Sequence, residues 1–248
     1  MANEKFGGDK KLPMTTLLAP LERRFIDASV GRFPAWIQGW HLTLTTILWS
    51  AGVIVFGWLG GRGGNLHWLW LSSVMIFMQW FTDCFDGALG RHRDFGIPRW
   101  GYYMDHLLDY VFMCAILIGY TFLLQGNERT IVYLLIPVFG GFMMNAYLAF
   151  GATGEFKITY LWTGPTEMRI AFIVLNAILT LFGTAWIQPL LVWILAGAVM
   201  FLCFVVFRTQ RYVWRKDMST RGPAAAGERK ERPHGGKQDT SPFGNPPR

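Results

Sequence analysis

The sequence predicts an all-α integral membrane protein, with six transmembrane helices preceded by an amphipathic surface helix. Of its 248 residues, 52% are hydrophobic and only 16% are charged. This composition is too apolar for an ordinary soluble domain. Six stretches reach the roughly 20 mostly apolar residues that a helix needs to cross a bilayer. Basic residues concentrate in alternate connections, which is typical of a multispanning protein.

The six predicted spans follow one another with short connections. They cover about residues 42–60, 66–84, 102–124, 130–150, 168–186 and 188–207. The second and third spans have the least sharply defined boundaries, because acidic residues stand at the end of one and in the first turns of the other. We therefore assign residues 41–210 to one six-span domain.

The segment before the first span, residues 1–40, is predicted to be cytoplasmic. Its stretch LLAPLERRFIDASVGRF, at 17–33, favours a helix lying on the membrane surface, with a short soluble helix as the alternative. Residues 1–35 contain no uninterrupted apolar core, so a cleaved secretory signal is not expected.

The distribution of positive charge predicts the orientation. Of the 23 Lys and Arg residues, only Arg62 and Arg129 fall on the opposite side of the predicted bilayer. Because positively charged loops stay in the cytoplasm, both termini and the connection between the second and third spans are predicted to be cytoplasmic.

The net charge of +7 requires no nucleic-acid partner. Basic residues directly after the last span can bind anionic lipid headgroups; they are Arg208, Arg211, Arg215 and Lys216. Residues 211–248 are predicted to form a basic cytoplasmic tail. From about residue 217 the tail is rich in Pro, Gly and charge, which predicts disorder.

Two other sequence features indicate helix packing. Cys84, Cys114 and Cys203 are scattered through predicted spans without the spacing of a zinc site. Gly57 and Gly61 form a small-xxx-small pair near the end of the first span.

Acidic residues cluster around the second connection, where the chain reads DCFDGALGRHRDFGIPRWGYYMDHLLDY over residues 83–110. Carboxylates within or beside membrane spans are energetically costly and usually functional. On a helix Asp83 and Asp86 share one face, and so do Asp105 and Asp109 on the next. Two neighbouring antiparallel helices would therefore direct four carboxylates into one cavity.

Four ionised carboxylates in one cavity would repel one another unless cations were present or some were protonated. Hard divalent cations with oxygen ligands fit best, and two Mg²⁺ ions would offset the four charges. The glycines on the same faces would let a phosphorylated ligand approach the backbone closely.

The cluster resembles the motif of the CDP-alcohol phosphotransferase family, also called CDP-alcohol phosphatidyltransferases, D-x-x-D-G-x-x-A-R-x(8)-G-x-x-x-D-x-x-x-D. Seven of its eight fixed residues occur here in order. Gly90 replaces the family's Ala and keeps that position small. The connection is one residue longer than the commonest spacing, which affects the placement of Arg91 rather than that of the carboxylates.

The resemblance implies a six-helix core and displacement of CMP from a CDP-alcohol by the hydroxyl group of an acceptor, in phospholipid biosynthesis. By resemblance, Asp83, Asp86, Asp105 and Asp109 hold two Mg²⁺ or Mn²⁺ ions. Asp109 also acts as general base. CDP is bound by Gly87, Gly90, Arg91 and Gly101, with a positive-inside anchor as the alternative role for Arg91. The resemblance also implies homodimers formed through membrane helices.

Other polar residues near the motif are candidates for binding the acceptor or for proton transfer. His106, in MDHLLD, resembles the Asp-His pairing of choline and ethanolamine phosphotransferases; a local hydrogen-bonding role is the alternative. Glu167 and Arg169, at the start of the fifth span, are expected at the cytoplasmic edge, where they would bind a polar headgroup or pair with each other. Weaker edge candidates are Asn145, Tyr147, Glu155 and Lys157.

The identity of the donor stays open at this point. CDP-diacylglycerol with a small polar alcohol is the first choice, because the chain is little longer than a six-span core. CDP-choline or CDP-ethanolamine with a lipid acceptor is the alternative, motivated by His106. Intramembrane prenyltransferases and divalent-ion transporters fit less well: the former use two separate Asp-rich motifs, and the latter place sites near the bilayer midplane, often in repeated halves.

Overall fold

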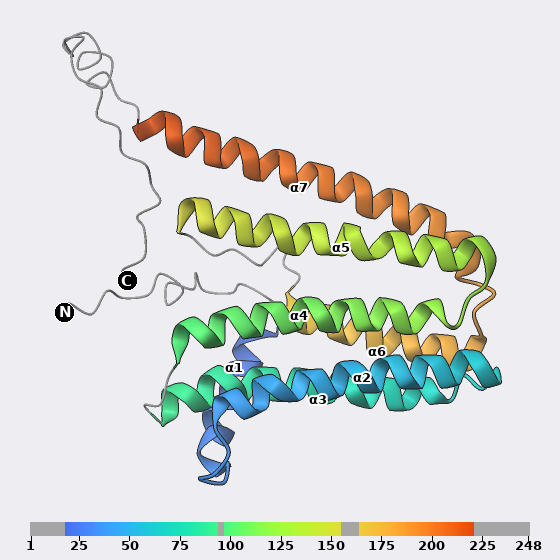
Figure 1. Cartoon of the computed structure of the whole chain (residues 1–248), viewed down its shortest axis with the longest axis horizontal. Helices are drawn as coiled ribbons and strands as arrows, with labels where there is room; N and C mark the ends of the chain where they lie inside the picture. The colour runs from blue at the N-terminus through green and yellow to red at the C-terminus, as the bar shows by residue number, and fades with distance from the viewer. Residues whose placement is uncertain (1–17, 94–96, 155–163, 221–248) are drawn as a thin grey trace, which may run out of the picture. The chain divides into compact units, whose positions relative to one another are not determined.

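The computed structural model describes residues 18–93, 97–154 and 164–220, and the part of the chain that it describes is helical with no strands (Figure 1). The elements in order are α1 (Ala19–Ser29), the 3₁₀ turn η2 (Val30–Arg32), α2 (Gly39–Gly63), α3 (Trp68–His92), α4 (Pro98–Thr121), α5 (Gly126–Thr153), α6 (Pro165–Phe182), η3 (Gln188–Leu190) and α7 (Leu191–Thr220). Each predicted span corresponds to one long helix.

Among the described residues, five helical segments are long and apolar enough to cross a membrane: α2, α4, α5, α6 and Gln188–Ser219. The described part of the chain is therefore all-helical and contains candidate membrane-spanning helices, which indicates an integral membrane protein. With 25 residues α3 has the length of a span, yet it is not among the five. Its polar residues, among them Ser72, Ser73, Gln79, Asp83 and Asp86, lower its apolar content. The count of six spans stays a prediction.

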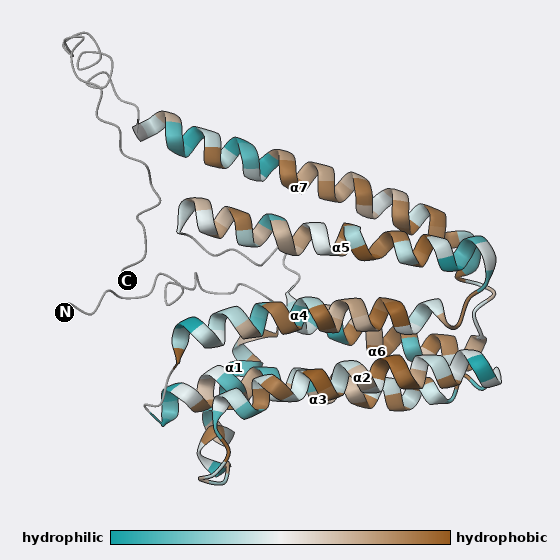
Figure 2. Ribbon diagram, in the orientation of Figure 1, coloured by the Kyte–Doolittle hydropathy of each residue, from teal (hydrophilic) through white to brown (hydrophobic). Residues whose placement is uncertain are grey.

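Local sequence signals set the helix ends. Gly64 and Gly154 follow α2 and α5 with φ of 62° and 71°, a left-handed conformation that glycine adopts without steric cost. Pro98 and Pro165 open α4 and α6 at a position where no backbone N–H is needed. Hydrophobic residues dominate the middle of the long helices (Figure 2).

The small-residue pair in α2 packs as the sequence predicts. A Cβ atom on Gly57 would lie 2.7 Å from the Cα of Gly119, and one on Gly61 would lie 1.9 Å from the carbonyl oxygen of Phe122. Both positions therefore bring the backbones of α2 and α4 into direct contact.

The helix predicted near the N-terminus exists as α1 and packs on α3. The ring of Phe25 stacks on Trp80 with centroids 6.4 Å apart and meets the edge of Phe85 at 5.6 Å. The carboxylate of Glu22 accepts hydrogen bonds from the Cys84 thiol at 3.3 Å and the Thr166 hydroxyl at 2.9 Å. That α1 lies on the membrane surface stays a prediction.

By its internal contacts the chain divides into two units, residues 1–209 and 210–248. The predicted tail begins as helix, because α7 continues to Thr220. The remainder of the tail, residues 221–248, lies outside the described residues. All features discussed below belong to the first unit.

Candidate active site

Three of the four motif carboxylates meet at one point. One carboxylate oxygen from each of Asp83 and Asp86 on α3 and Asp105 on α4 lies within 4.8 Å of the other two. The three side chains are only partly buried, so an ion can reach them. An all-carboxylate set of oxygen donors suits a hard divalent cation such as Mg²⁺. The residues therefore fit the metal that the sequence predicts.

Helix α2 contacts this cluster at Asp86. The hydroxyl of Thr43 donates a hydrogen bond to Oδ2 of Asp86 at 2.7 Å, and the backbone N–H of Gly87 donates to Oδ1. A Cβ atom on Gly39 would lie 2.3 Å from the carbonyl oxygen of Asp86. The absence of a side chain at Gly39 thus lets the start of α2 approach the motif backbone.

The fourth carboxylate is held by Arg169, which is nearly fully buried. Nη2 of Arg169 lies 3.0 Å from Oδ1 of Asp109 and also 3.0 Å from Oδ2 of Asp83. The same nitrogen therefore joins α6 to both α3 and α4. Of the two alternatives that the sequence offered for Arg169, an ion pair with Glu167 is not formed, because Asp83 and Asp109 are its partners; its expected position at the cytoplasmic edge stays a prediction.

Gln79 is a further contact of Asp109 that the sequence analysis did not identify. Its side chain is fully buried, and Nε2 donates a hydrogen bond to Oδ1 of Asp109 at 3.3 Å. A signal was present in the sequence: Gln79 precedes Asp83 by four residues and Asp86 by seven, so all three share one face of α3.

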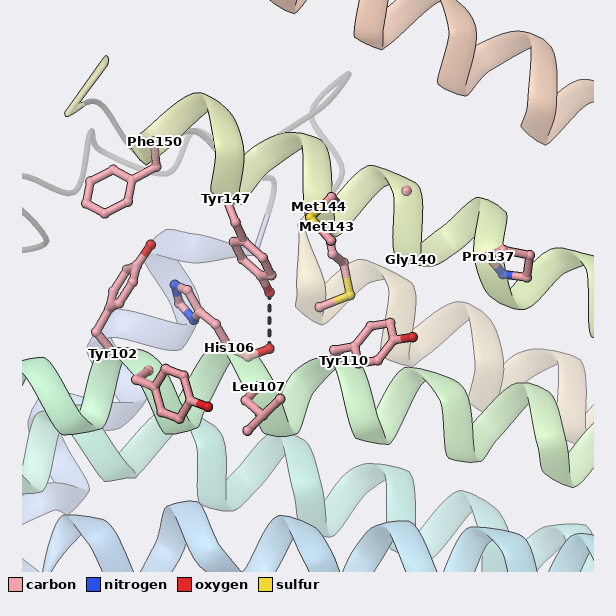
Figure 3. Close-up of a pocket in the computed structure, with 12 residues that line it drawn as sticks. Tyr102, His106, Leu107, Tyr110, Pro137, Gly140, Met143, Met144, Tyr147 and Phe150 are labelled. Carbon is pink, nitrogen blue, oxygen red and sulfur yellow. Dashed lines mark hydrogen bonds between the residues drawn. The ribbon is translucent and has the colours of Figure 1, made fainter. Parts of the chain in front are cut away.

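His106 lies beside the cluster, between aromatic rings. Its Nδ1 is 3.1 Å from Oδ2 of Asp105. The ring of Tyr102 is 4.3 Å away between centroids, and the ring of Tyr147 stacks on His106 at 5.3 Å. The Tyr147 hydroxyl donates to the backbone carbonyl of His106 at 3.2 Å, which ties α5 to α4 (Figure 3).

Two apolar cavities adjoin these residues. The first has a volume of about 660 Å³ and lies between α4 and α5 (Figure 3); its aromatic lining comprises Tyr102, Tyr103, Tyr110, Tyr147 and Phe150. The second has a volume of about 450 Å³ and is lined by α4, α5, α6 and α7. Asp109 and Arg169 are the charged residues in the lining of the second cavity. His106, Met143 and Tyr147 line both.

The predicted CDP-binding residues occupy the ends of α3 and α4. Gly87 and Arg91 are exposed. A Cβ atom on Gly87 would lie 3.2 Å from Nη1 of Arg91. Gly90 is partly buried on α3, and a Cβ atom on Gly101 would have no neighbour within 4 Å. Gly101 therefore faces open space, whereas Gly87 lies close to the Arg91 side chain.

Glu167 caps the start of α6. Its Oε2 accepts a hydrogen bond from the backbone N–H of Gly164 at 3.0 Å, and its Oε1 accepts one from the backbone N–H of Leu18 at 3.4 Å. Among the weaker edge candidates, Asn145 donates to the Thr209 hydroxyl at 3.1 Å. Glu155 and Lys157 lie outside the described residues.

Comparison with known proteins identifies a family whose model covers the acidic cluster. The family model described as CDP-alcohol phosphatidyltransferase matches residues 40–214. A search of the curated proteins finds no match to the chain. The family match covers well over half of the chain and includes the acidic cluster, so the chain belongs to the CDP-alcohol phosphatidyltransferase family. Membership implies transfer of a phosphoalcohol from a CDP-alcohol to an acceptor.

Proposed function

We propose, from this family membership, that the protein transfers the phosphatidyl group of CDP-diacylglycerol to a small polar alcohol and releases CMP, in phospholipid biosynthesis. The reaction depends on Mg²⁺, which Mn²⁺ can replace. The alternative donors are CDP-choline and CDP-ethanolamine, with a lipid as acceptor.

One observation carries this proposal: a motif carboxylate, Asp109, lines an apolar cavity. Asp109 lines the 450 Å³ cavity, and Asp83 is linked to Asp109 through Arg169. An apolar cavity within the bundle suits acyl chains, while the carboxylates suit a metal-bound diphosphate. A substrate with both parts, such as CDP-diacylglycerol, fits this combination.

The site residues have four proposed roles: binding metal, binding CDP, transferring the proton and contacting the acceptor. Asp83, Asp86, Asp105 and Asp109 hold two Mg²⁺ ions. When bound, these ions supply the positive charge that offsets the diphosphate and the departing CMP. CDP is bound by Gly87, Gly90, Arg91 and Gly101. Asp109 accepts the proton of the acceptor hydroxyl, and His106, beside Asp105, assists proton transfer.

Glu167 and Arg169 are proposed to contact the acceptor. The guanidinium group has five N–H donors, and both ion pairs of Arg169 use Nη2, so donors remain for a polar headgroup or a phosphate. The carboxylate of Glu167 already accepts a hydrogen bond from Gly164 at the start of α6. Its proposed contact with the acceptor therefore has less support than that of Arg169.

A specific observation favours the alternative donors. The 660 Å³ cavity is rich in aromatic side chains and adjoins His106, which pairs with Asp105. Aromatic rings attract quaternary ammonium groups. Choline would therefore fit this cavity, either as part of CDP-choline or as the free acceptor of a phosphatidyl group.

The proposed topology has six spans, with α3 as the sixth spanning helix. The distribution of positive charge supports a topology with both termini and the connection between α3 and α4 in the cytoplasm. CDP-alcohols are water-soluble or have a water-soluble head, so a carboxylate cluster near the cytoplasmic ends of α3 and α4 would meet them there. Homodimer formation is part of the proposal and follows from the family alone.

The test is CMP release by the detergent-purified protein. CDP-diacylglycerol, CDP-choline and CDP-ethanolamine are each supplied with Mg²⁺ and a mixture of hydroxyl acceptors. We expect Mg²⁺-dependent CMP release from CDP-diacylglycerol and its loss in Asp109→Asn. The matched control is Asp27→Asn, which removes an exposed carboxylate on α1 outside the site.

Each outcome distinguishes the candidates. Release from CDP-choline or CDP-ethanolamine alone would replace the first choice by the alternative. Folded protein that releases no CMP from any of the three donors would contradict the proposed reaction, and pyrophosphate release from a prenyl diphosphate would indicate a different enzyme class.

A further inference from the structure

Gln79 occupies a position that folding alone does not favour. The residue is fully buried in α3, and no hydrogen bond reaches its Oε1 from any residue that the structure describes. Burying an amide oxygen without a partner destabilises a protein, since the oxygen loses its hydrogen bond to water. An apolar side chain of the same shape would avoid this cost. The amide therefore lowers the stability of the fold, and a role in the site would explain its presence.

The amide nitrogen of Gln79, unlike its oxygen, forms a hydrogen bond, and the acceptor is Asp109. Nε2 of Gln79 lies 3.3 Å from Oδ1 of Asp109, and Nη2 of Arg169 lies 3.0 Å from the same oxygen. The two donors come from different helices, α3 and α6. Within the described part of the chain, no hydrogen bond reaches Oδ2 of Asp109.

Such an arrangement orients a carboxylate. The terminal torsion of an aspartate is broad and roughly two-fold, so an unrestrained carboxylate samples many orientations. Two donors on one oxygen fix the plane of the group and leave the second oxygen available. Asp109 lines the 450 Å³ cavity, so the available oxygen can meet a substrate that enters there.

We propose that Gln79 is a positioning residue for the transfer reaction: with Arg169 it holds Oδ1 of Asp109, so that Oδ2 receives the proton of the acceptor hydroxyl. This inference rests on the proposed role of Asp109 as general base. Gln79 itself touches neither substrate nor metal ligand other than Asp109, and its effect on the rate passes through that carboxylate. In the step, the acceptor O–H bond breaks, its proton moves to Oδ2, and the acceptor oxygen forms the new bond to phosphorus as CMP leaves.

The first test is Gln79→Met, which keeps the length of the side chain and removes the amide. We expect kcat to fall about 10-fold to 100-fold, as expected for a misplaced catalytic group, with KM for the CDP-alcohol within about two-fold. The thermal unfolding midpoint is expected to stay unchanged or to rise, because an unsatisfied buried oxygen is removed. The rise of that midpoint on adding Mg²⁺ is expected to equal that of the unsubstituted protein.

The matched control is Ser73→Ala, on the same helix. The Ser73 hydroxyl is buried and accepts a hydrogen bond from Nδ2 of Asn176 at 3.1 Å. Its removal is expected to lower the unfolding midpoint and to leave kcat unchanged. A loss of kcat in Gln79→Met without a loss of stability, and the reverse in Ser73→Ala, would show that Gln79 positions Asp109 and does not merely pack in the core.

A double variant tests whether Gln79 acts through Asp109. If it does, Gln79→Met combined with Asp109→Asn will be no slower than Asp109→Asn alone. A kcat for Gln79→Met within two-fold of the unsubstituted protein, while Asp109→Asn is inactive, would overturn the positioning role and leave the proposed function intact. Full activity of Asp109→Asn would overturn the general-base role and this inference with it.

A third outcome also overturns the inference. If Gln79→Met loses the Mg²⁺-induced rise of the unfolding midpoint, or raises KM for the CDP-alcohol in proportion to the loss of rate, then Gln79 supports the metal or CDP site instead of the base. Measuring the Mg²⁺ response by thermal unfolding keeps this readout independent of turnover.

Discussion

Two regions of the bundle pack in different ways. In the carboxylate region, formed by α2, α3 and α4, helix backbones touch at Gly39, Gly57 and Gly61. In the cavity region, formed by α5 and α7 up to Thr209, glycines meet side chains: Gly140 faces the ring of Tyr110 and Gly141 faces Leu202. Within an apolar 18-residue window of each segment, 33% of the window in α2 and 44% of that in α4 is buried, against 17% in α5 and 11% in Gln188–Ser219.

The difference matches what each region has to do. Backbone contact between helices leaves little freedom, so carboxylates on α3 and α4 keep fixed positions. Large side chains leave cavities between helices, and both cavities described above have α5 in their lining. In the proposed function, the tight region therefore positions charge, and the open region would provide space for the substrate.

The largest expected effect is the loss of activity when a motif carboxylate is replaced. Asp83→Asn, Asp86→Asn, Asp105→Asn and Asp109→Asn should each lower CMP release by about 10³-fold or more, because metal binding and charge neutralisation supply most of the catalysis in phosphoryl transfer. Membrane insertion should be unaffected. Preserved turnover in two or more of these variants would contradict the two-metal assignment.

A smaller effect is expected when the helix packing of the same region is disrupted. Gly61→Val places a side chain against the carbonyl of Phe122 and should destabilise the protein by about 3 kcal/mol or more, as overpacking does. Gly197→Ala on α7, where a Cβ atom meets nothing within 4 Å, should be neutral or slightly stabilising. Thermal unfolding of both variants in detergent checks the contrast. Equal destabilisation would mean that the two regions tolerate added volume alike.

The smallest effect probes the cavity region. Ala198 lines the 450 Å³ cavity, and Ala198→Phe should raise KM for the lipid substrate about 10-fold by filling space that the acyl chains need. The Mg²⁺-induced rise of the unfolding midpoint should not change. The control is Val199→Phe, at the next residue of α7, where 41% of the residue is exposed. An unchanged KM in Ala198→Phe would show that the lipid binds elsewhere.

The local parts of the site were predictable from the sequence. Asp83 with Asp86, and Asp105 with Asp109, share helix faces because of the helical repeat alone. The short connection between α3 and α4 then makes the two pairs neighbours. The convergence of Asp83, Asp86 and Asp105 within 4.8 Å follows this expectation.

The partners of these carboxylates were less predictable. Thr43 precedes Asp86 by 43 residues, and Arg169 follows Asp109 by 60. Neither distance along the chain says which helices pack together. The ion pairs of Arg169 with Asp83 and Asp109 were therefore not expected, and neither was the contact of Gln79 with Asp109, although Gln79 shares the face of Asp83.

The sequence by itself determined the helices and the faces that bear charge, because a bilayer requires apolar runs of a set length and a helix repeats every 3.6 residues. Only the tertiary structure decided that Arg169 bridges Asp83 and Asp109, that Gln79 also donates to Oδ1 of Asp109, and that Asp109 lines an apolar cavity. These contacts depend on how α3, α4 and α6 rotate and approach, which side-chain packing sets throughout the bundle.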